Sequence, residues 1–473
     1  MTGTEHQRET AKGSPETHGA PPEGAPENDL HDGAKPSPRL GERLRERATA
    51  RVDPGSVVVL RLLVGLLLFV SIARFVARGW VETLLLAPDF HFRYWGFEWV
   101  PVPGATLAYG LFALTGAAAL GLAMGVRVRL CAALAFSSFT WLELIDLTYY
   151  LNHYVFLSAL LLTFALVPPR PGPDGKLPAW ALWLIRTQVG LVYVYAGIAK
   201  LGADWLLGAQ PLTIWLARHS DMAIVGPWLD EPFTAYAASW AGAIFDLLVV
   251  PALLWRPTRA WAYLGVVGFH LVTGFLFPIG MFPWFMIGCA TIFFAPAWPR
   301  RWLAPGTLLE RPAPTARPRL DRALGVVAAL SLGAQLLMPW RYLLYPGSVL
   351  WHEQGMRYSY RVMLVEKGGA IEFRVHDRSA ERSWYVDPRT ELTPLQVKSM
   401  STQPDLIAAY ARALAARLEH QRPGARIEVY ADAFVAVNGR PSARLIDPTV
   451  DLASVEDGLW PKPWILPGPE DLR

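Results

Sequence analysis

The stretch VVVLRLLVGLLLFVSIARFVA, residues 57–77, is apolar over almost its whole length. A helix that crosses a bilayer needs about 20 consecutive, mostly apolar residues, and this run meets that length. It begins well inside the chain and is too long for the apolar part of a signal peptide, so it is expected to stay in the protein. The run predicts an integral membrane protein whose first span lies here.

The composition of the whole chain agrees with a membrane location. The sequence has 473 residues, 52% hydrophobic and 18% charged, with 20 tryptophans, which is unlike a soluble protein with a single core. The formal charge of +4 comes from arginines in short segments between apolar runs, as in cytoplasmic membrane loops. No basic and aromatic stripe suits nucleic acid, so no nucleic-acid partner is expected. Cys131 and Cys289 lie inside apolar runs, which excludes a disulfide framework.

Eight more apolar stretches follow the first, and together they predict an α-helical polytopic membrane protein with about nine transmembrane helices. The nine stretches cover roughly residues 56–77, 104–125, 129–148, 151–168, 181–201, 234–254, 260–277, 281–297 and 321–338. The third and fourth almost touch, which predicts a tight hairpin at Tyr149 and Tyr150.

Arginines and lysines set the expected orientation. They precede span one and follow spans two, four, six and eight, while the alternate short loops are nearly free of them. The positive-inside rule then places the amino terminus in the cytoplasm and the region after span nine outside. We expect a disordered cytoplasmic tail over residues 1–52, which is poor in large apolar residues, a transmembrane domain over 53–340 and an extracytoplasmic domain over 341–473.

The region after span nine has the patterns of a small α+β domain. Three segments are predicted to be strands: RYSYRVMLVEK (357–367), AIEFRVHD (370–377) and SWYVD (383–387). The first two are joined at Gly368 and Gly369. Residues 403–420 repeat apolar groups at helical spacing, and Asn438 with Gly439 is the favoured pair for a two-residue hairpin turn.

Five strongly polar residues of the spans share one depth, the outer half of the membrane. They are Lys200 and Asp146 at the outer ends of spans five and three, Asn152 and His153 at the start of span four, and His270 in span seven. Such groups are costly in hydrocarbon and tend to face the interior of a helical bundle. A shared depth therefore predicts a shared cavity.

Each of these residues also has a purely structural interpretation. A lysine at the end of a span can snorkel to the headgroups, and a buried histidine is commonly satisfied by one core partner. Asp246, deep in span six, is expected to pair with Arg186 in span five, unless both line a path. The functional interpretation of Lys200 rests on desolvation: a dry cavity disfavours the ammonium form, so the amine can serve as a general base.

Metal and nucleophile chemistry finds little support in the motifs. No two of the ten histidines are three to five residues apart, so the paired-histidine helices of metal enzymes are absent. His153 and His270 lack the motif that accompanies haem ligation. The sequence GRPSARLID (439–447) has no serine in a Gly-x-Ser-x-Gly setting. We therefore expect no metal cofactor.

Four motifs, in order along the chain, resemble one known family. They are LNHYVFLSALLLTF (151–164), VYAGIAKLGADWLLGAQPLTIWL (194–216), FDLLVVPALLWRPTR (245–259) and FHLVTGFLFPIGMFPW (269–284). Together they resemble the membrane domain of the vitamin K-dependent gamma-glutamyl carboxylases and their bacterial relatives, often called HTTM proteins. The resemblance covers about residues 55–340 and continues more loosely into the last domain.

The resemblance implies an enzyme and its catalytic residues. In these carboxylases a lysine at the place of Lys200 deprotonates reduced vitamin K, and oxygen addition then gives an epoxide and a strongly basic alkoxide. That base removes a γ-proton from a peptide glutamate, and CO2 adds to the carbanion. Asn152 and His153 match the pair thought to orient the lysine. The implied reactants are vitamin K hydroquinone or menaquinol from the lipid phase, O2, CO2 and a glutamate-containing peptide.

The residues expected around the two substrates follow from the same comparison. For the quinone they are His270, Tyr193, Trp205 and Trp284, and for the glutamate peptide Tyr345, Trp351, Arg357 and Arg361. Arg361 stands where animal enzymes have an acidic residue, and Thr273 stands where an asparagine is expected. The quinone half of the reaction is therefore better supported than the glutamate half.

Two other functions stay open on the sequence. A hydroquinone epoxidase or oxidase would keep the quinone chemistry without carboxylation. A non-enzymatic transporter or scaffold would use Lys200 as a proton or substrate relay. The content of Ala, Arg and Trp favours a bacterial inner membrane, with the last domain in the periplasm.

Overall fold

The computed structural model describes residues 40–168, 175–302 and 318–472. Most of the tail that is predicted to be disordered, residues 1–39, lies outside the described residues. The described remainder of the tail forms helix α1 (Leu40–Thr49) and strand β1 (Arg51–Val52), which pairs antiparallel with strand β2 (Leu177–Pro178). The chain from Arg47 onward forms one unit, distinct from Met1–Glu46.

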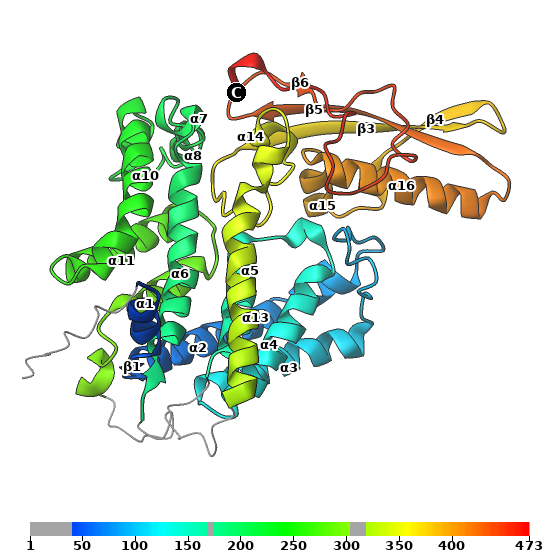
Figure 1. The fold of residues 1–473 in the computed structure, drawn as a ribbon. Coiled ribbons are helices and arrows are strands. Elements are labelled where there is room, and N and C mark those ends of the chain that lie inside the picture. The colour runs from blue at the N-terminus through cyan, green and yellow to red at the C-terminus, as the bar shows by residue number, and fades with distance from the viewer. Residues whose placement is uncertain (1–39, 169–174, 303–317, 473) are drawn as a thin grey trace, which may run out of the picture. The chain divides into compact units, whose positions relative to one another are not determined.

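Each predicted span overlaps a helix, and most of these helices are labelled in Figure 1. The helices are α2 (Gly55–Ala77), α3 (Ala105–Ala123), α4 (Val128–Leu144), α5 (Asn152–Leu166), α6 (Ala179–Ala199), α10 (Pro232–Leu254), α11 (Arg259–Leu276), α12 (Phe282–Ala290) and α13 (Pro318–Leu337). Five described stretches are long and apolar enough to cross a membrane: α2, α3, α6, α10 and Arg319–Leu344, which covers most of α13. The chain is thus a helical membrane protein. Helices α4, α5, α11 and α12 are shorter, with 9 to 18 residues, so the number of nine spans stays a prediction.

Small residues let the first helices approach closely. A Cβ atom on Gly65 of α2 would lie 2.5 Å from the carbonyl oxygen of Ala119 in α3, so only glycine fits at this crossing. Leu60, Val64 and Leu68 of α2 are buried in an apolar core that also takes in residues of α3 to α6 and α10 to α12. Four short helices connect longer elements: α7 (Ala203–Leu206), α8 (Leu212–Ala217), α9 (Gly226–Leu229) and α14 (Val349–His352).

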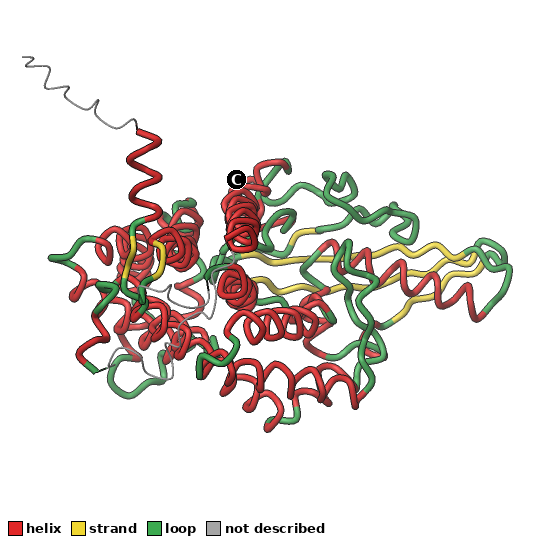
Figure 2. The backbone as a smooth tube through the Cα atoms, turned by 60° about the horizontal axis from the view of Figure 1, so that its bottom comes forward, coloured by secondary structure: helices red, strands yellow, loops and turns green. Residues whose placement is uncertain are grey.

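The last part of the chain contains one four-stranded antiparallel sheet in the order β4-β3-β5-β6. The strands are β3 (Lys367–Asp377), β4 (Arg382–Val386), β5 (Ile427–Val437) and β6 (Ala443–Arg444). They lie side by side as one layer in Figure 2. Helix α15 (Pro394–Met400) precedes α16 (Pro404–Gln421), which packs on β5. Phe373, Val429 and Tyr410 are buried in the core between sheet and helix.

The first predicted strand, RYSYRVMLVEK, is wrong except for its last residue. The glycine pair after it lies inside β3, where a Cβ atom on Gly369 would be 2.5 Å from the carbonyl oxygen of Ser401. The glycine thus serves a close approach to the end of α15 and not a turn. The residues before β3 form turns instead, with positive φ at Tyr358 (64°), Tyr360 (53°) and Met363 (56°). L-residues seldom adopt this conformation, so periodicity could not reveal it.

The predicted turn at Asn438 and Gly439 is present, and it holds the chain next to Lys200. Both residues have positive φ, 50° and 79°, as a two-residue turn of this class requires. The Asn438 side-chain amide donates to Asp204 Oδ2 at 2.8 Å, and Arg440 Nη2 lies 2.6 Å from Asp204 Oδ1. Asp204 is in α7, directly after the end of α6, so the hairpin fixes the segment that follows the lysine.

Asp146 is a buried junction residue and not a helix end that faces water. It accepts hydrogen bonds from the backbone N–H of Thr148 and the side-chain amide of Gln396, both at 2.9 Å. It also accepts a hydrogen bond from the Thr148 hydroxyl at 2.7 Å, and His91 Nδ1 lies 3.2 Å from its Oδ2 atom. Because Gln396 belongs to α15, Asp146 joins the hairpin between α4 and α5 to the sheet region. The shared cavity predicted for Asp146 and Lys200 is therefore wrong in this respect.

Candidate functional site

A cavity of about 430 Å³ lies at the carboxyl end of α6. Apolar side chains of α6, α8, α10 and α11 form most of its lining, because these helices pack against one another through their apolar faces. The titratable side chains in the lining are those of Tyr193 in α6, Lys200 directly after α6, Asp246 in α10 and His270 in α11, and Trp205 of α7 lies among them. Lys200 and His270 thus share a cavity, as predicted from their depth.

Lys200 is paired with Asp246. Its Nζ atom lies 2.7 Å from Asp246 Oδ2 and 5.2 Å from the centre of the Trp205 ring. The side chains of the pair are only 8% and 6% exposed, so neither charge is solvated by bulk water. The expected pair of Asp246 and Arg186 is wrong, because Arg186 donates instead to two backbone carbonyl groups that follow α12. The desolvation argument treats Lys200 as an isolated amine, whereas in the structure it has a carboxylate partner.

Tyr193 and His270 form a second polar pair in this cavity. The Tyr193 hydroxyl and His270 Nε2 are 3.1 Å apart, and the tautomer of the histidine decides which one donates. The other ring nitrogen, His270 Nδ1, is buried and has no hydrogen-bond partner within the described ranges. An unsatisfied buried polar atom costs about 1–3 kcal/mol. A ligand with a polar group at this place would remove that cost.

A second cavity of about 410 Å³ adjoins the first, and Phe282 lines both. The centre of the Phe282 ring is 5.5 Å from that of His153 and 5.7 Å from that of His270. Asn152 and His153, at the start of α5, line only the second cavity, where Asn152 accepts a hydrogen bond from the Tyr150 hydroxyl at 3.0 Å. The expected contact of this pair with Lys200 is thus absent from the described residues, because an aromatic wall intervenes.

Two arginines line the second cavity without a counter-ion. Arg74 comes from the carboxyl end of α2, and the Arg361 guanidinium lies 4.0 Å from the centre of the Tyr342 ring. The Nε atoms of both are buried without a hydrogen-bond partner, and neither arginine has a carboxylate partner in the part of the chain that the structure describes. Guanidinium groups bind carboxylates through paired, charge-assisted hydrogen bonds. This cavity is therefore suited to an anionic ligand.

The segment 357–363 reaches both of these cavities. Its strained turns carry Val362 and Met363 to the wall shared by the first two cavities and Arg361 to the second cavity. The backbone N–H of Tyr358 donates to the Tyr150 hydroxyl at 2.6 Å, which ties the segment to the start of α5. Backbone strain of this kind persists only where the surroundings enforce it, and it is common at ligand sites.

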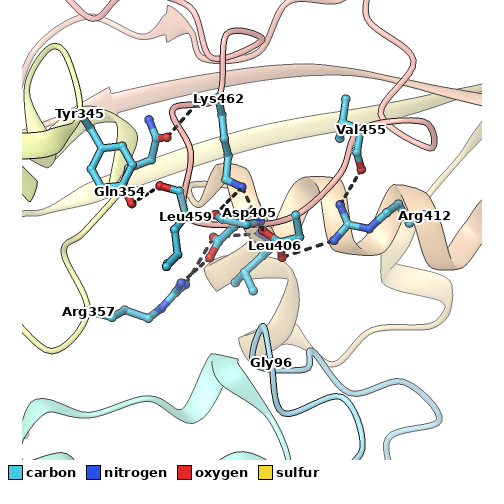
Figure 3. A network of polar contacts seen from close by, with 12 residues as sticks. Gly96, Tyr345, Gln354, Arg357, Asp405, Leu406, Arg412, Val455, Leu459 and Lys462 are labelled. Atoms are coloured by element: carbon cyan, nitrogen blue, oxygen red, sulfur yellow. Dashed lines mark hydrogen bonds and ion pairs between the residues drawn. The ribbon is translucent and has the colours of Figure 1, made fainter. Parts of the chain in front are cut away.

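A third cavity of about 530 Å³ lies beside the sheet region and is lined by Tyr345 and Arg357. Figure 3 shows its polar network, in which Arg357 binds Asp405. Lys462 forms an ion pair with Asp457 in the same region. Burial alone would raise the pKa of Asp405, but the charge and hydrogen bonds of Arg357 outweigh it and hold the pKa below its ordinary value. Arg357 is thus already paired, and its guanidinium is less available to a substrate than that of Arg361.

The Arg357 and Asp405 pair is expected to stabilise the sheet region. Asp405→Asn leaves a mostly buried arginine without its partner, which should lower the free energy of unfolding by about 2–4 kcal/mol at pH 7. Since the folded pKa of Asp405 is depressed, the stabilisation is present above the unfolded value of about 3.9 and is lost as pH falls through the folded pKa. Thermal unfolding of both proteins at several pH values checks this.

The control for this prediction is Glu381→Gln, at an exposed position between β3 and β4, which should unfold like the wild type. Equal unfolding midpoints for Asp405→Asn and wild type at pH 7 would contradict the stabilising role. A difference that persisted undiminished as the pH fell through the folded pKa of Asp405 would show that the charge on Asp405 is not its source.

Trp284, Trp351 and Tyr345, which are predicted to contact the quinone or the peptide, lie in three different surroundings. Trp284 is half exposed and lines none of the three cavities. Trp351 is buried, and its indole N–H donates to the backbone carbonyl of Leu466 at 2.8 Å, as in a core residue. Tyr345 lines the third cavity, with its hydroxyl donating to the carbonyl of Leu459 at 2.8 Å.

Two residues of these sites, Arg74 and Phe282, are absent from the site residues predicted from the sequence, and Asp246 is predicted with another partner. Arg74 is a charged residue inside the first apolar run, and such a residue within a span is itself a signal for a functional partner. Asp246 is expected to pair with Arg186 or to line a path, and the structure pairs it with Lys200. Phe282 lies in the fourth motif of the resemblance, but its apolar pattern alone does not distinguish it from a core residue. Within the described ranges no cluster of His, Cys, Asp and Glu could hold a metal ion.

Comparison with known proteins adds two matches. Residues 50–298 match the family model of the HTTM domain. Residues 321–471 match the model described as vitamin K-dependent gamma-carboxylase, lumenal domain. No solved structure matches the chain.

Proposed function

Because the chain belongs to the vitamin K-dependent gamma-carboxylase family, with an HTTM domain before a carboxylase lumenal domain, we propose that it is a membrane-embedded peptidyl-glutamate carboxylase. It couples oxidation of vitamin K hydroquinone or menaquinol by O2 to carboxylation of glutamate side chains with CO2. The observation that carries the proposal is the buried Lys200 in an apolar cavity, beside a second cavity lined by two arginines that have no carboxylate partner among the described residues.

The first cavity fits a lipid-borne hydroquinone. Its volume of about 430 Å³ and its largely apolar lining suit an aromatic ring with an isoprenoid tail. Lys200 would face one ring hydroxyl, and the unsatisfied His270 Nδ1 would meet a polar group of the ring. Tyr193 orients His270, and Trp205 supplies an aromatic surface. When bound, the hydroquinone supplies the reducing power and the strong base that the carboxylation requires.

The second cavity fits the glutamate side chain. Arg74 and Arg361 would bind the γ-carboxylate, since both line this cavity and neither has a carboxylate partner among the described residues. Phe282 and Met363 line both cavities, so the two reactants would lie next to each other. A carbanion in bulk water is protonated at once, so a dry and closed arrangement is required for CO2 to compete. Asn152 and His153 line this cavity and would contact the peptide or CO2 rather than Lys200.

The proposed topology places both cavities near the outer surface. With nine spans and a cytoplasmic amino terminus, the region from 341 onward is extracytoplasmic, in a bacterium periplasmic, where peptides reach Arg361 from water. The quinone enters from the lipid between α10 and α11, which carry exposed apolar residues such as Leu248 and Phe275. This arrangement gives each reactant access from the phase in which it is soluble.

The decisive experiment incubates the purified full chain with reduced vitamin K, a glutamate-containing peptide, O2 and labelled bicarbonate as the source of CO2. We expect label in the peptide and an equal amount of quinone epoxide. Epoxide without fixed label would leave a hydroquinone epoxidase. Neither product, with menaquinol tested in parallel, would contradict the proposed enzyme.

A further inference from the structure

We propose that Lys200 acts as a base only together with Asp246. Lys200 passes its own proton to Asp246 as it takes one from the hydroxyl of a bound hydroquinone. Asp246 is then a positioning residue that acts through Lys200 and also stores the lysine's proton. The inference rests on the proposed hydroquinone substrate and assigns to Asp246 a role in its deprotonation.

The geometry leaves Asp246 as the acceptor of that proton. Within the described ranges, Lys200 Nζ lies 2.7 Å from Asp246 Oδ2, 3.4 Å from the carbonyl oxygen of Ala196 and 5.2 Å from the centre of the Trp205 ring. A backbone carbonyl and an indole ring stabilise an ammonium group but do not take its proton at accessible pH. The carboxylate of Asp246 can take that proton. It also holds the amine in place, because it comes from α10 and faces α6 across the cavity.

The other titratable groups that line the cavity do not compete for this role. Tyr193 and His270 lie 3.1 Å apart and hydrogen-bond each other. Helix α8 contributes only Leu212 and Leu216, and α7 contributes Trp205. Among the described residues that line this cavity, Asp246 is therefore the group bonded to Lys200 that can change its protonation state.

Charge balance favours the relay in an apolar cavity. At rest the ammonium of Lys200 and the carboxylate of Asp246 neutralise each other. In the transfer, one O–H bond of the hydroquinone breaks and one N–H bond of Lys200 forms, while another N–H bond of Lys200 breaks and an O–H bond of Asp246 forms. Afterwards the ammonium of Lys200 faces the negative charge left on the substrate, and Asp246 is neutral. No step creates an unpaired charge, which costs several kcal/mol in such surroundings.

Infrared difference spectroscopy tests the relay without turnover. Hydroquinone is added without oxygen to the purified full chain. We expect the C=O stretch of a protonated carboxylic acid to appear, to shift when aspartate is labelled with carbon-13, and to be absent from Asp246→Asn. The matched control is Glu143→Gln, which changes a carboxylate of α4 that accepts a hydrogen bond from Ser158 at 2.9 Å and lines none of the three cavities; it should keep the band.

Kinetics give a second test. Asp246→Asn should lower kcat for hydroquinone oxidation about 100-fold with little change in hydroquinone affinity, and Asp246→Glu should restore most of the rate. A structural ion pair alone would not produce the infrared band. Full turnover by Asp246→Asn would overturn the relay, because an isolated amine would then suffice.

The infrared result also separates this proposal from the proposed function. If hydroquinone binds to the wild type without the carboxylic acid band, the relay is wrong and the enzyme assignment stands. If hydroquinone does not bind to the wild type at all, both are wrong. If Asp246→Asn does not fold, the carboxylic acid band of the wild type and its isotope shift still show whether an aspartate takes up the proton.

Discussion

Replacing Lys200 with methionine is expected to reduce hydroquinone epoxidation by about 10³- to 10⁴-fold, the upper range for loss of a general base. Methionine nearly matches the length of lysine and the apolar part of its side chain, but it cannot accept a proton. Because carboxylation depends on the quinone reaction, fixation of labelled CO2 should fall by the same factor. Both products are measured in one assay, together with hydroquinone binding, which should persist.

The substitution Lys200→Met also leaves Asp246 buried without its partner, which is expected to destabilise the protein. The double variant Lys200→Met with Asp246→Asn removes both charges and should fold like the wild type while remaining inactive. Lys398→Met, at an exposed lysine of α15, is the control for the substitution itself. Turnover of the double variant within tenfold of the wild type would exclude Lys200 as the base.

The second large effect is expected at the arginine pair. Arg74→Gln combined with Arg361→Gln removes two charge-assisted hydrogen bonds of about 1.5–3 kcal/mol each, which corresponds to a loss of about 10³-fold in kcat/KM for the glutamate peptide. The loss should lie in the dependence on peptide and not in the dependence on hydroquinone. Initial rates measured while each substrate is varied separately make this distinction.

Arg389→Gln is the matched control, because Arg389 is 77% exposed and pairs only with a nearby aspartate within the described chain. It should leave the peptide dependence unchanged. A glutamine-containing peptide that bound to the wild type as tightly as the glutamate peptide would show that the carboxylate is not recognised. An unchanged peptide kcat/KM in the double arginine variant would place the glutamate site elsewhere, with the third cavity the next candidate.

The helices were predictable because a membrane span is a local property. Twenty or so apolar residues in a row suffice to locate α2 or α10, and a tight hairpin between α4 and α5 follows from the short gap between two such runs. The turn at Asn438 and Gly439 was predictable for the same reason, since both residues tolerate positive φ. The depth of Lys200 and His270 within their spans also led correctly to one cavity.

The segment around Arg361 shows where local patterns fail. Its alternation of apolar and polar residues is that of a strand, but the ladder of β3 begins only at Lys367. Contacts with the start of α5, such as the bond from Tyr358 N–H to the Tyr150 hydroxyl, hold the residues before it in turns. Those contacts join residues about two hundred positions apart, so no window of sequence contains them.

Hydropathy was thus enough to define a helical membrane protein and to place Lys200 among five polar residues of one depth, and the family resemblance named it as the expected base. Packing alone decided that Asp246 is the partner of Lys200, that Phe282 separates Lys200 from His153, and that Arg74 and Arg361 line one second cavity. The physical reason is range: burial of a span depends on neighbours along the chain, whereas an ion pair or a cavity depends on which side chains the helices bring within a few ångströms of each other.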